Sequence, residues 1–240
     1  MKFSIAIIAA LPGELQPLVR GWKHERRGSV HLWSGSVGEY EVTAACAGAG
    51  RECATRAFAA AESLGTIDQT ISWGWVGALD ETFEPGKAYG CSEVVDLKTG
   101  ERFCCAEAPA NSKENQNMLV TSPRVAGVAE KLRLAAAYGP GLVDMEAAAV
   151  ARLAVMRGIP FLCIKGVSDG FRDHLPDFNR FMGADGQMQM GKLIVYALFH
   201  PGCWPSLMRM GENSRRAAVA MAVRVRALWT MAESRENDSF

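Results

Sequence analysis

The stretch that decides the fold runs from Gly141 to Gly170 and reads GLVDMEAAAVARLAVMRGIPFLCIKGVSDG. Asp144 has a side chain suited to a helix cap, and Ala147–Met156 after it is a run of strong helix formers. A glycine and a proline then end the predicted helix. The mostly apolar run Phe161–Val167 is typical of a strand buried on both faces. A helix followed by such a strand predicts an α/β fold.

Two carboxylates flank this helix–strand unit. Glu146 lies in the first turn of the predicted helix, where the helix dipole favours an anion, and Asp169 follows the strand. In open α/β sheets, ligands bind outside the carboxyl ends of strands. Each motif alone also fits an ordinary cap or an ordinary turn. The two motifs in this order, joined by a helix of small residues, indicate a functional site.

The motifs V-D-M-E at Val143–Glu146 and V-S-D at Val167–Asp169 resemble those of the nucleoside phosphorylase and nucleosidase family, which cleaves the bond between ribose and base. The resemblance implies a three-layer α/β fold, with a mixed central sheet flanked by helices and a C-terminal helical extension. It also implies an enzyme in which Met145 and Glu146 bind the ribose. Asp169 is then the catalytic acid that protonates the leaving purine.

Glu14 is a third carboxylate at the end of a predicted strand. The apolar run Phe3–Ala9 predicts a buried first strand, and Pro12 begins a helix after it. A glutamate at this place also fits a simple anion at a helix N-terminus. In the resembled family, a glutamate here is catalytic in the hydrolytic members, where it activates the attacking water.

A glycine-rich turn follows a basic segment. Gly21–Gly38 is basic and irregular, although Ser29–Ser34 and Glu39–Ala45 have the pattern of two strands in a hairpin. The turn Ala47–Arg51 comes next and opens an Ala-rich helix. Such a turn points backbone N–H groups and a helix dipole at an anion, and Arg51 adds a positive charge. The glycines also fit close packing of the helix on the preceding strand.

The resemblance assigns a phosphate or water pocket to Gly50 and Arg51 together with Gly74 and Trp75. Members of the family usually carry a small residue where Trp75 stands. Its indole is therefore expected either to narrow the phosphate pocket or to turn toward the 5′ side of the sugar.

The base is expected against the segment that follows the short strand Leu119–Ser122. By resemblance, Val125 and Ala126 in this segment bind the base together with Ser168. Val125 stands near the position of an aromatic residue that stacks on the base in the family. Stacking is then weaker here or comes from another part of the chain.

Composition excludes several classes of partner and cofactor. With Lys+Arg 26 and Asp+Glu 26, the formal net charge is zero, so bulk charge predicts no binding to nucleic acid. The seven cysteines lack the spacing of a zinc site, so we expect reduced thiols and no metal. No cofactor is expected except inorganic phosphate as co-substrate of a phosphorylase. No apolar run reaches the length of a membrane span, and we expect a cytoplasmic protein.

We expect residues 1–200 to form a nucleoside phosphorylase-like α/β domain and residues 201–240 to form a C-terminal amphipathic helical extension of the same domain. Lys192–Phe199 is strongly apolar, and Arg215–Met231 mixes apolar residues with arginines. This composition fits peripheral contact with the inner face of a membrane. It also fits a helix packed on the sheet or on a second subunit. The family resemblance adds the expectation of a homo-oligomer.

Within the family, the A-E-K-L-R helix at Ala129–Arg133 and the S-R-R-A motif at Ser214–Ala217 are most similar to hopanoid-associated phosphorylases. This resemblance implies phosphorolysis of adenosylhopane, a lipid-linked adenosine, with release of adenine in hopanoid biosynthesis. The first alternative is a nucleosidase that hydrolyses methylthioadenosine or S-adenosylhomocysteine. The second is a non-catalytic nucleotide-binding or membrane-peripheral protein on the same fold.

Overall fold

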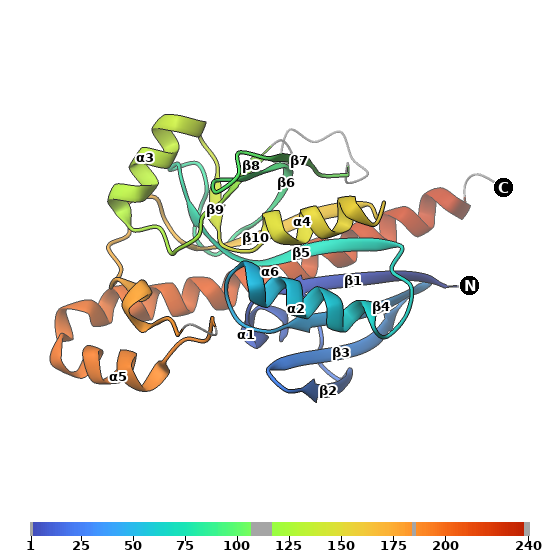
Figure 1. The fold of residues 1–240 in the computed structure, drawn as a ribbon, viewed down its shortest axis with the longest axis horizontal. Coiled ribbons are helices and arrows are strands. Elements are labelled where there is room, and N and C mark those ends of the chain that lie inside the picture. The colour runs from blue at the N-terminus through green and yellow to red at the C-terminus, as the bar shows by residue number, and fades with distance from the viewer. Residues whose placement is uncertain (1, 107–116, 184–185, 238–240) are drawn as a thin grey trace.

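Ten strands form one sheet within the described part of the chain. The computed structural model describes residues 2–106, 117–183 and 186–237 (Figure 1). The strands are β1 (Phe3–Ala9), β2 (Lys23–Arg27), β3 (Val30–Val37), β4 (Tyr40–Cys46), β5 (Gln69–Ala78), β6 (Ala88–Asp96), β7 (Arg102–Cys104), β8 (Asn117–Thr121), β9 (Leu142–Asp144) and β10 (Phe161–Asp169). The α-helices are α1 (Pro12–Leu15), α2 (Arg51–Glu62), α3 (Val128–Tyr138), α4 (Ala147–Met156), α5 (Met190–Phe199) and α6 (Trp204–Asn237). Short 3₁₀ helices are η2 (Phe178–Phe181) and η3 (Pro201–Cys203).

The sheet is mixed, and β5 lies at its centre. The order is β10-β6-β8-β9-β5-β1-β4-β3-β2, and β7 pairs with β6. β5 pairs in parallel with β1 and β10 and in antiparallel with β9. Because β10 pairs with β6 as well as with β5, strands β5, β10, β6, β8 and β9 close a circuit of pairings. Gly77 of β5 thereby has both Asp169 and Val143 as strand partners.

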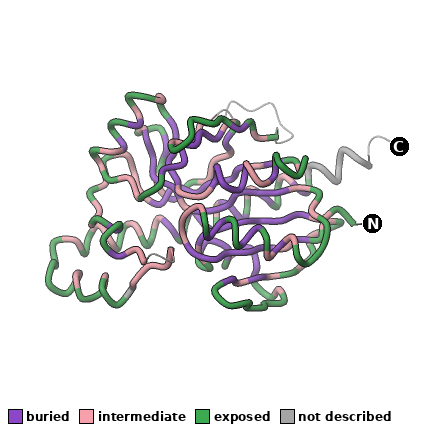
Figure 2. Tube along the Cα trace, viewed as in Figure 1, coloured by how far each residue is buried: buried purple, intermediate pink, exposed green. Residues whose placement is uncertain are grey.

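Helices cover both faces of the sheet. Alternate residues of β1 belong to different cores: Ala6 and Ile8 pack toward α2 and α4, whereas Ile5 and Ile7 pack toward α6. Met221 is a fully buried residue of α6 in this second core. The central strands β1, β5 and β10 accordingly lie in the buried interior of the molecule (Figure 2). This arrangement confirms the expected three-layer α/β fold with a mixed sheet.

The local predictions hold where the hydrophobic pattern is strong. β1 and the alanine-rich run of α4 have the limits expected from the sequence, and β10 continues two residues beyond Val167. The expectation of an irregular Gly21–Gly38 is wrong at its start, where Lys23–Arg27 forms the edge strand β2. All five residues of β2 are exposed, so the strand shows no apolar alternation that sequence reasoning could detect.

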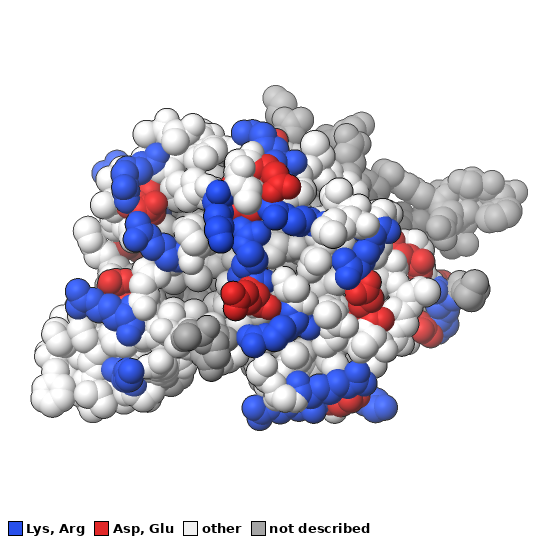
Figure 3. All heavy atoms as spheres, in the orientation of Figure 1, with Lys and Arg blue, Asp and Glu red and all other residues white. Residues whose placement is uncertain are grey.

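The C-terminal part forms a helical hairpin, which we call the α5–α6 hairpin (190–210). α6 is one helix, and the segment Arg215–Met231 packs on β10 and β5 as the sheet-covering layer. α5 lies away from the sheet at the lower left of Figure 1 and contacts η2 and η3. Its surface in the viewed face is largely uncharged (Figure 3). Among the described residues, none of the helices combines the length and apolarity that crossing a bilayer requires.

Candidate active site

One cavity of about 190 Å³ lies beside the ends of β1, β5, β9 and β10. Eight of the residues singled out from the sequence line it: Glu14, Trp75, Val125, Ala126, Met145, Glu146, Ser168 and Asp169. The two strand partners of Gly77 explain why the distant motifs meet, because its pairing sets the ends of β9 and β10 on either side of β5. Gly50, Arg51 and Gly74 lie outside the lining of this cavity.

Glu146 stands at the N-cap of α4, next to Met145. The backbone N–H of Gly50 donates to Glu146 Oε1 at 2.6 Å, so the glycine-rich turn holds this carboxyl group. Burial, reinforced by the negative charge of Asp144, raises the pKa of Glu146 to about 8. The group therefore carries a proton over much of the neutral range, and a cationic ligand beside it would favour its charged form.

A buried polar network lies behind Glu146. Asp144 accepts hydrogen bonds from the backbone N–H of Ala147, the first residue of α4, at 2.9 Å and from Thr121 Oγ1 at 2.7 Å. The N-cap residue is Glu146, so α4 starts one residue after Glu146 and not before it as the sequence predicted. Lys165 Nζ lies 2.9 Å from Asp144 Oδ2 and also donates to Ser72 Oγ at 2.9 Å. Burial alone would lower the pKa of Lys165, but the neighbouring negative charges, led by that of Asp144, outweigh it and raise the pKa. Sequence reasoning missed this lysine, although a lysine inside an apolar strand is itself a signal.

Glu14 is held almost entirely by backbone groups. The N–H groups of Ala10 and Leu11 donate to Oε2 at 2.9 Å each, and the N–H of Trp75 donates to Oε1 at 3.0 Å. Gly74, with φ +150°, leaves room for the carboxylate, since a Cβ there would lie 3.0 Å from Glu14 Oε1. Burial raises the pKa of Glu14, although the three N–H donors oppose the shift. A buried carboxylate with a raised pKa is suited to accept a proton from water.

Trp75 turns its indole toward the helices that border the cavity. A Cβ on Gly13 of α1 would lie 3.0 Å from the indole ring, so the ring packs against the backbone there. Its Nε1 donates to the carbonyl oxygen of Ser214 on α6 at 2.8 Å. The ring thus ties β5 to the C-terminal helix while it lines the cavity.

Asp169 ends β10 with both carboxylate oxygens engaged. Ser168 Oγ donates to Oδ1 at 2.6 Å, and Lys131 Nζ of α3 forms an ion pair with Oδ2. Lys131 also donates to the carbonyl oxygen of Gly170 at 2.7 Å. The sequence placed Lys131 in a helix but gave no reason to pair it with Asp169, which lies 38 residues further along the chain.

The remaining wall of the cavity is apolar and rich in methionine. Val125 is fixed through its backbone, since its N–H donates to Asn179 Oδ1 at 2.9 Å and its carbonyl accepts from Asn179 Nδ2 at 3.0 Å. These backbone atoms therefore already have partners. Phe178 also lines the cavity and supplies an aromatic ring that Val125 lacks. Leu175, Met182, Met188 and Met210 also belong to this apolar wall. A flat base fits such a polarisable wall.

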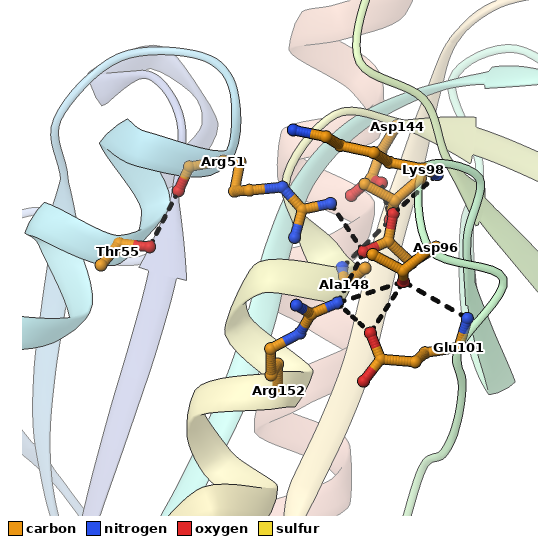
Figure 4. Close-up of polar contacts among 10 residues, drawn as sticks. Arg51, Thr55, Asp96, Lys98, Glu101, Asp144, Ala148 and Arg152 are labelled. Atoms are coloured by element: carbon orange, nitrogen blue, oxygen red, sulfur yellow. Dashed lines mark hydrogen bonds and ion pairs between the residues drawn. The ribbon is translucent and has the colours of Figure 1, made fainter.

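The pocket predicted for phosphate or water is divided in the structure. Gly50 and Arg51 line a neighbouring cavity of about 350 Å³ that also borders Met145. Arg51 donates to buried Asp96 Oδ2 at 2.6 Å, and Arg152 reaches the same atom at 2.9 Å (Figure 4). Asp96 therefore compensates much of the Arg51 charge.

None of the seven cysteines lines the cavity that holds Glu14, Glu146 and Asp169, although Cys53 lines the neighbouring one. All seven are free thiols. Cys91 and Cys105 hydrogen-bond to Cys163 within the core. In the part of the chain that the structure describes, no three His, Cys, Asp or Glu residues are grouped so that they could hold a metal ion.

A match between the sequence of this chain and a family model identifies the family. The model of the phosphorylase superfamily matches residues 4–103 and 96–198. The chain therefore belongs to the phosphorylase superfamily and is an enzyme of the nucleoside phosphorylase and nucleosidase type, which cleaves a glycosidic bond. Among curated proteins, none matches the chain significantly.

Solved structures share the whole fold at low sequence identity. The 5′-methylthioadenosine/S-adenosylhomocysteine nucleosidase from Helicobacter pylori, with butyl-thio-DADMe-Immucillin-A, has a TM-score of 0.72 at 13% identity, covering 96% of this chain and 99% of that one. The apo 5′-methylthioadenosine nucleosidase of Arabidopsis thaliana has a TM-score of 0.73 at 18% identity, with 96% of each chain covered. Futalosine hydrolase of Helicobacter pylori has a TM-score of 0.72 at 14% identity, covering 96% and 99%. At these identities, the likeness establishes the fold.

Proposed function

We propose that this protein hydrolyses the N-glycosidic bond of a 5′-substituted adenosine. One observation carries the proposal: Glu14, Glu146 and Asp169 line the same cavity, and Glu14 is buried in a cradle of backbone N–H groups. Three carboxyl groups around one cavity of this size supply a base, a sugar-binding group and an acid. Hydrolysis of a nucleoside needs these three functions.

The chemistry follows from the positions of these groups. The C1′–N9 bond breaks with both electrons leaving on the base, and Asp169 provides the proton that N7 takes up. The ribose becomes cation-like, which favours the charged form of Glu146 beside it and strengthens hydrogen bonds to the ribose hydroxyls. Water then attacks C1′ and gives its proton to Glu14. Met145 packs on the sugar.

Hydrolysis fits the charges of the cavity better than the phosphorolysis that the sequence favoured. Arg124 is the single cation among the described residues that line this cavity, and its largely exposed side chain pairs with Glu130. A phosphate beside Glu14 would meet a buried carboxylate. Arg51, the cation expected to hold phosphate, is engaged by Asp96 in the neighbouring cavity. A neutral water avoids this repulsion.

A second candidate is phosphorolysis of a lipid-linked adenosine such as adenosylhopane, and the α5–α6 hairpin favours it. Ile194, Leu198 and Phe199 are exposed on the hairpin, while Met210 at its end lines the catalytic cavity. From Gly186 to Gly211 the sequence has no acidic residue, and its charges are those of Lys192 and Arg209. Such a surface suits the inner face of an anionic membrane. Phosphate would then occupy the adjoining cavity with Arg51 and Lys98.

An assay of base release separates these candidates. Adenine release from 5′-methylthioadenosine and from adenosylhopane, with and without phosphate, identifies the nucleophile and the 5′ group. Release without phosphate supports hydrolysis, whereas release that requires phosphate and yields a ribose 1-phosphate supports the second candidate.

Membrane contact is tested by co-sedimentation with anionic vesicles. The double variant Leu198→Ser/Phe199→Ser should lose vesicle binding if the hairpin makes the contact. The matched control is Val155→Ser/Met156→Ser, because these residues of α4 are exposed to a similar degree. Equal binding by both variants would exclude the hairpin as the contact.

A further inference from the structure

Lys131 is a buried lysine with one carboxylate partner, and that partner is the catalytic acid. Its side chain is 2% exposed, and α3 otherwise presents mainly exposed or half-buried residues. Lysine is almost never buried this fully unless it is paired. Nζ contacts Asp169 Oδ2 and the Gly170 carbonyl, both at the end of β10. Lys131 does not itself line the cavity, so it can act on a ligand only through Asp169.

The backbone leaves a specific space for this lysine. A Cβ on Gly77 would lie 2.8 Å from Lys131 Cε and 3.1 Å from both Lys131 Nζ and Asp169 Oδ2. Any other residue at this position would push apart the lysine and its partner. Gly77 is also the residue of β5 that pairs with Asp169. The sheet, the glycine and the lysine together fix the orientation of one carboxyl group.

We propose that Lys131 is the positioning residue that holds Asp169 and supplies, through it, the proton that the leaving base takes up. This inference rests on the proposed function. Lys131 Nζ carries N–H bonds and contacts Asp169 Oδ2, so the pair can pass on one proton as a unit. As the base leaves, a Lys131 Nζ–H bond breaks, the proton passes by way of Asp169 Oδ2, and an N7–H bond forms.

The charges before and after this proton transfer balance. Before cleavage, Lys131 and Asp169 carry one positive and one negative charge, and afterwards Lys131 is neutral and Asp169 is again a carboxylate. N7 has gained the proton, and the electrons of the broken C1′–N9 bond stay on the base. Solvent restores the proton to Lys131 after the base departs. Glu14, Glu146 and Arg124 line the same cavity as Asp169. Glu130 pairs with Arg124 and Arg133, and Asp173 accepts a hydrogen bond from the Gly170 N–H.

The test is a comparison of leaving groups in Lys131→Met. One substrate is 5′-methylthioadenosine, whose adenine needs protonation, and the other is p-nitrophenyl β-D-ribofuranoside, whose nitrophenolate leaves without a proton. We expect kcat to fall about 100-fold or more for the first, as for loss of a general acid, and to change less than about threefold for the second. The KM values should change little. Lys23→Met, at an exposed position of β2, is the control for loss of a lysine.

The pH dependence of kcat in the Lys131 variants is an independent test. Without Lys131, Asp169 can donate only when it is itself protonated, so the ratio of variant to wild-type kcat should rise as the pH falls. Lys131→Arg keeps a positive charge but a guanidinium does not release its proton, so kcat should stay low. Equal losses for both leaving groups at every pH, rescue by arginine, or wild-type kcat in Lys131→Met would each overturn the inference. Failure of the proposed function would instead show as no base release by the wild type.

Discussion

The backbone N–H of Gly50 donates to Oε1 of Glu146 at 2.6 Å, which joins two motifs that lie 96 residues apart. The glycine-rich turn thus orients the glutamate at the start of α4. The N–H groups of Gly48, Ala49 and Gly50 all donate to acceptors within the protein. This bond links the region expected to bind phosphate to the group expected to bind ribose.

Glu146→Gln should change how stability depends on pH. The pKa of Glu146 is raised from 4.5 to about 8, so the folded protein binds this proton more tightly than the unfolded chain. The resulting stabilisation is complete below about pH 4.5 and is lost as the pH rises through about 8. Glutamine stays neutral, so the variant should gain stability relative to the wild type over this window, at most about 1.4 kcal/mol per pH unit. Urea unfolding at pH 5, 7 and 9 measures the difference. A difference that is constant with pH would contradict the assignment.

Asp169→Asn should abolish turnover while it preserves binding. The amide keeps the shape of the carboxyl group but cannot pass a proton to N7, so kcat should fall by about 10²–10⁴. Calorimetry with adenine should show an affinity within a few-fold of the wild type. Loss of turnover with retained affinity would show that Asp169 acts in the chemical step and not in binding alone. Retained turnover would remove Asp169 from the reaction.

Glu14 should set the acid limb of the pH–rate profile. The attacking water gives its proton to a carboxylate, so kcat/KM falls as the pH drops through the pKa of Glu14, which burial raises above the ordinary 4.5. The profile of the wild type should therefore decline at a pH above 4.5. Glu14→Gln should lose about 10²-fold or more in kcat at every pH. An acid limb at an ordinary glutamate value would argue against this buried base.

Lys165→Met should destabilise the fold. Removing the lysine leaves the buried carboxylate of Asp144 without its ion-pair partner, at a cost of about 3–5 kcal/mol. The exposed control Lys23→Met should cost less than about 0.5 kcal/mol. In a double-mutant cycle, Lys165→Met/Asp144→Asn should be more stable than the sum of the single changes predicts, because no charge is then left unpaired. Additive free energies of unfolding would show that the two side chains do not interact.

The sequence predicted the fold where the signal is local. The apolar run of β1 and the alanine-rich run of α4 begin and end at clear changes in the sequence, and the predicted limits of both runs are confirmed. β2 carries no such pattern, since its exposed residues are held by pairing with β3. The continuity of α6 was also hidden, because Gly211 and the charged residues after it interrupt the apolar pattern, although the helix continues through them.

The candidate site was predictable only in part. Glu14, Glu146 and Asp169 could be selected because each follows or precedes a regular element at the edge where strands end. Lys131 and Phe178 could not, since their importance arises from contacts with residues far away in the sequence. Arg51 shows the reverse: its motif fits an anion site, but Asp96 already supplies the anion. Sequence patterns place a side chain on an element, and long-range pairing decides what that side chain meets.

The most direct test of the central claim is base release by the purified wild-type protein from a panel of 5′-substituted adenosines in phosphate-free buffer, with products separated by chromatography. We expect free adenine and the 5′-substituted ribose, with no dependence on added phosphate. We also expect Glu14→Gln and Asp169→Asn each to stop this release. Adenine release that appears only with phosphate, or that persists in both variants, would contradict a hydrolysis carried out by these carboxyl groups.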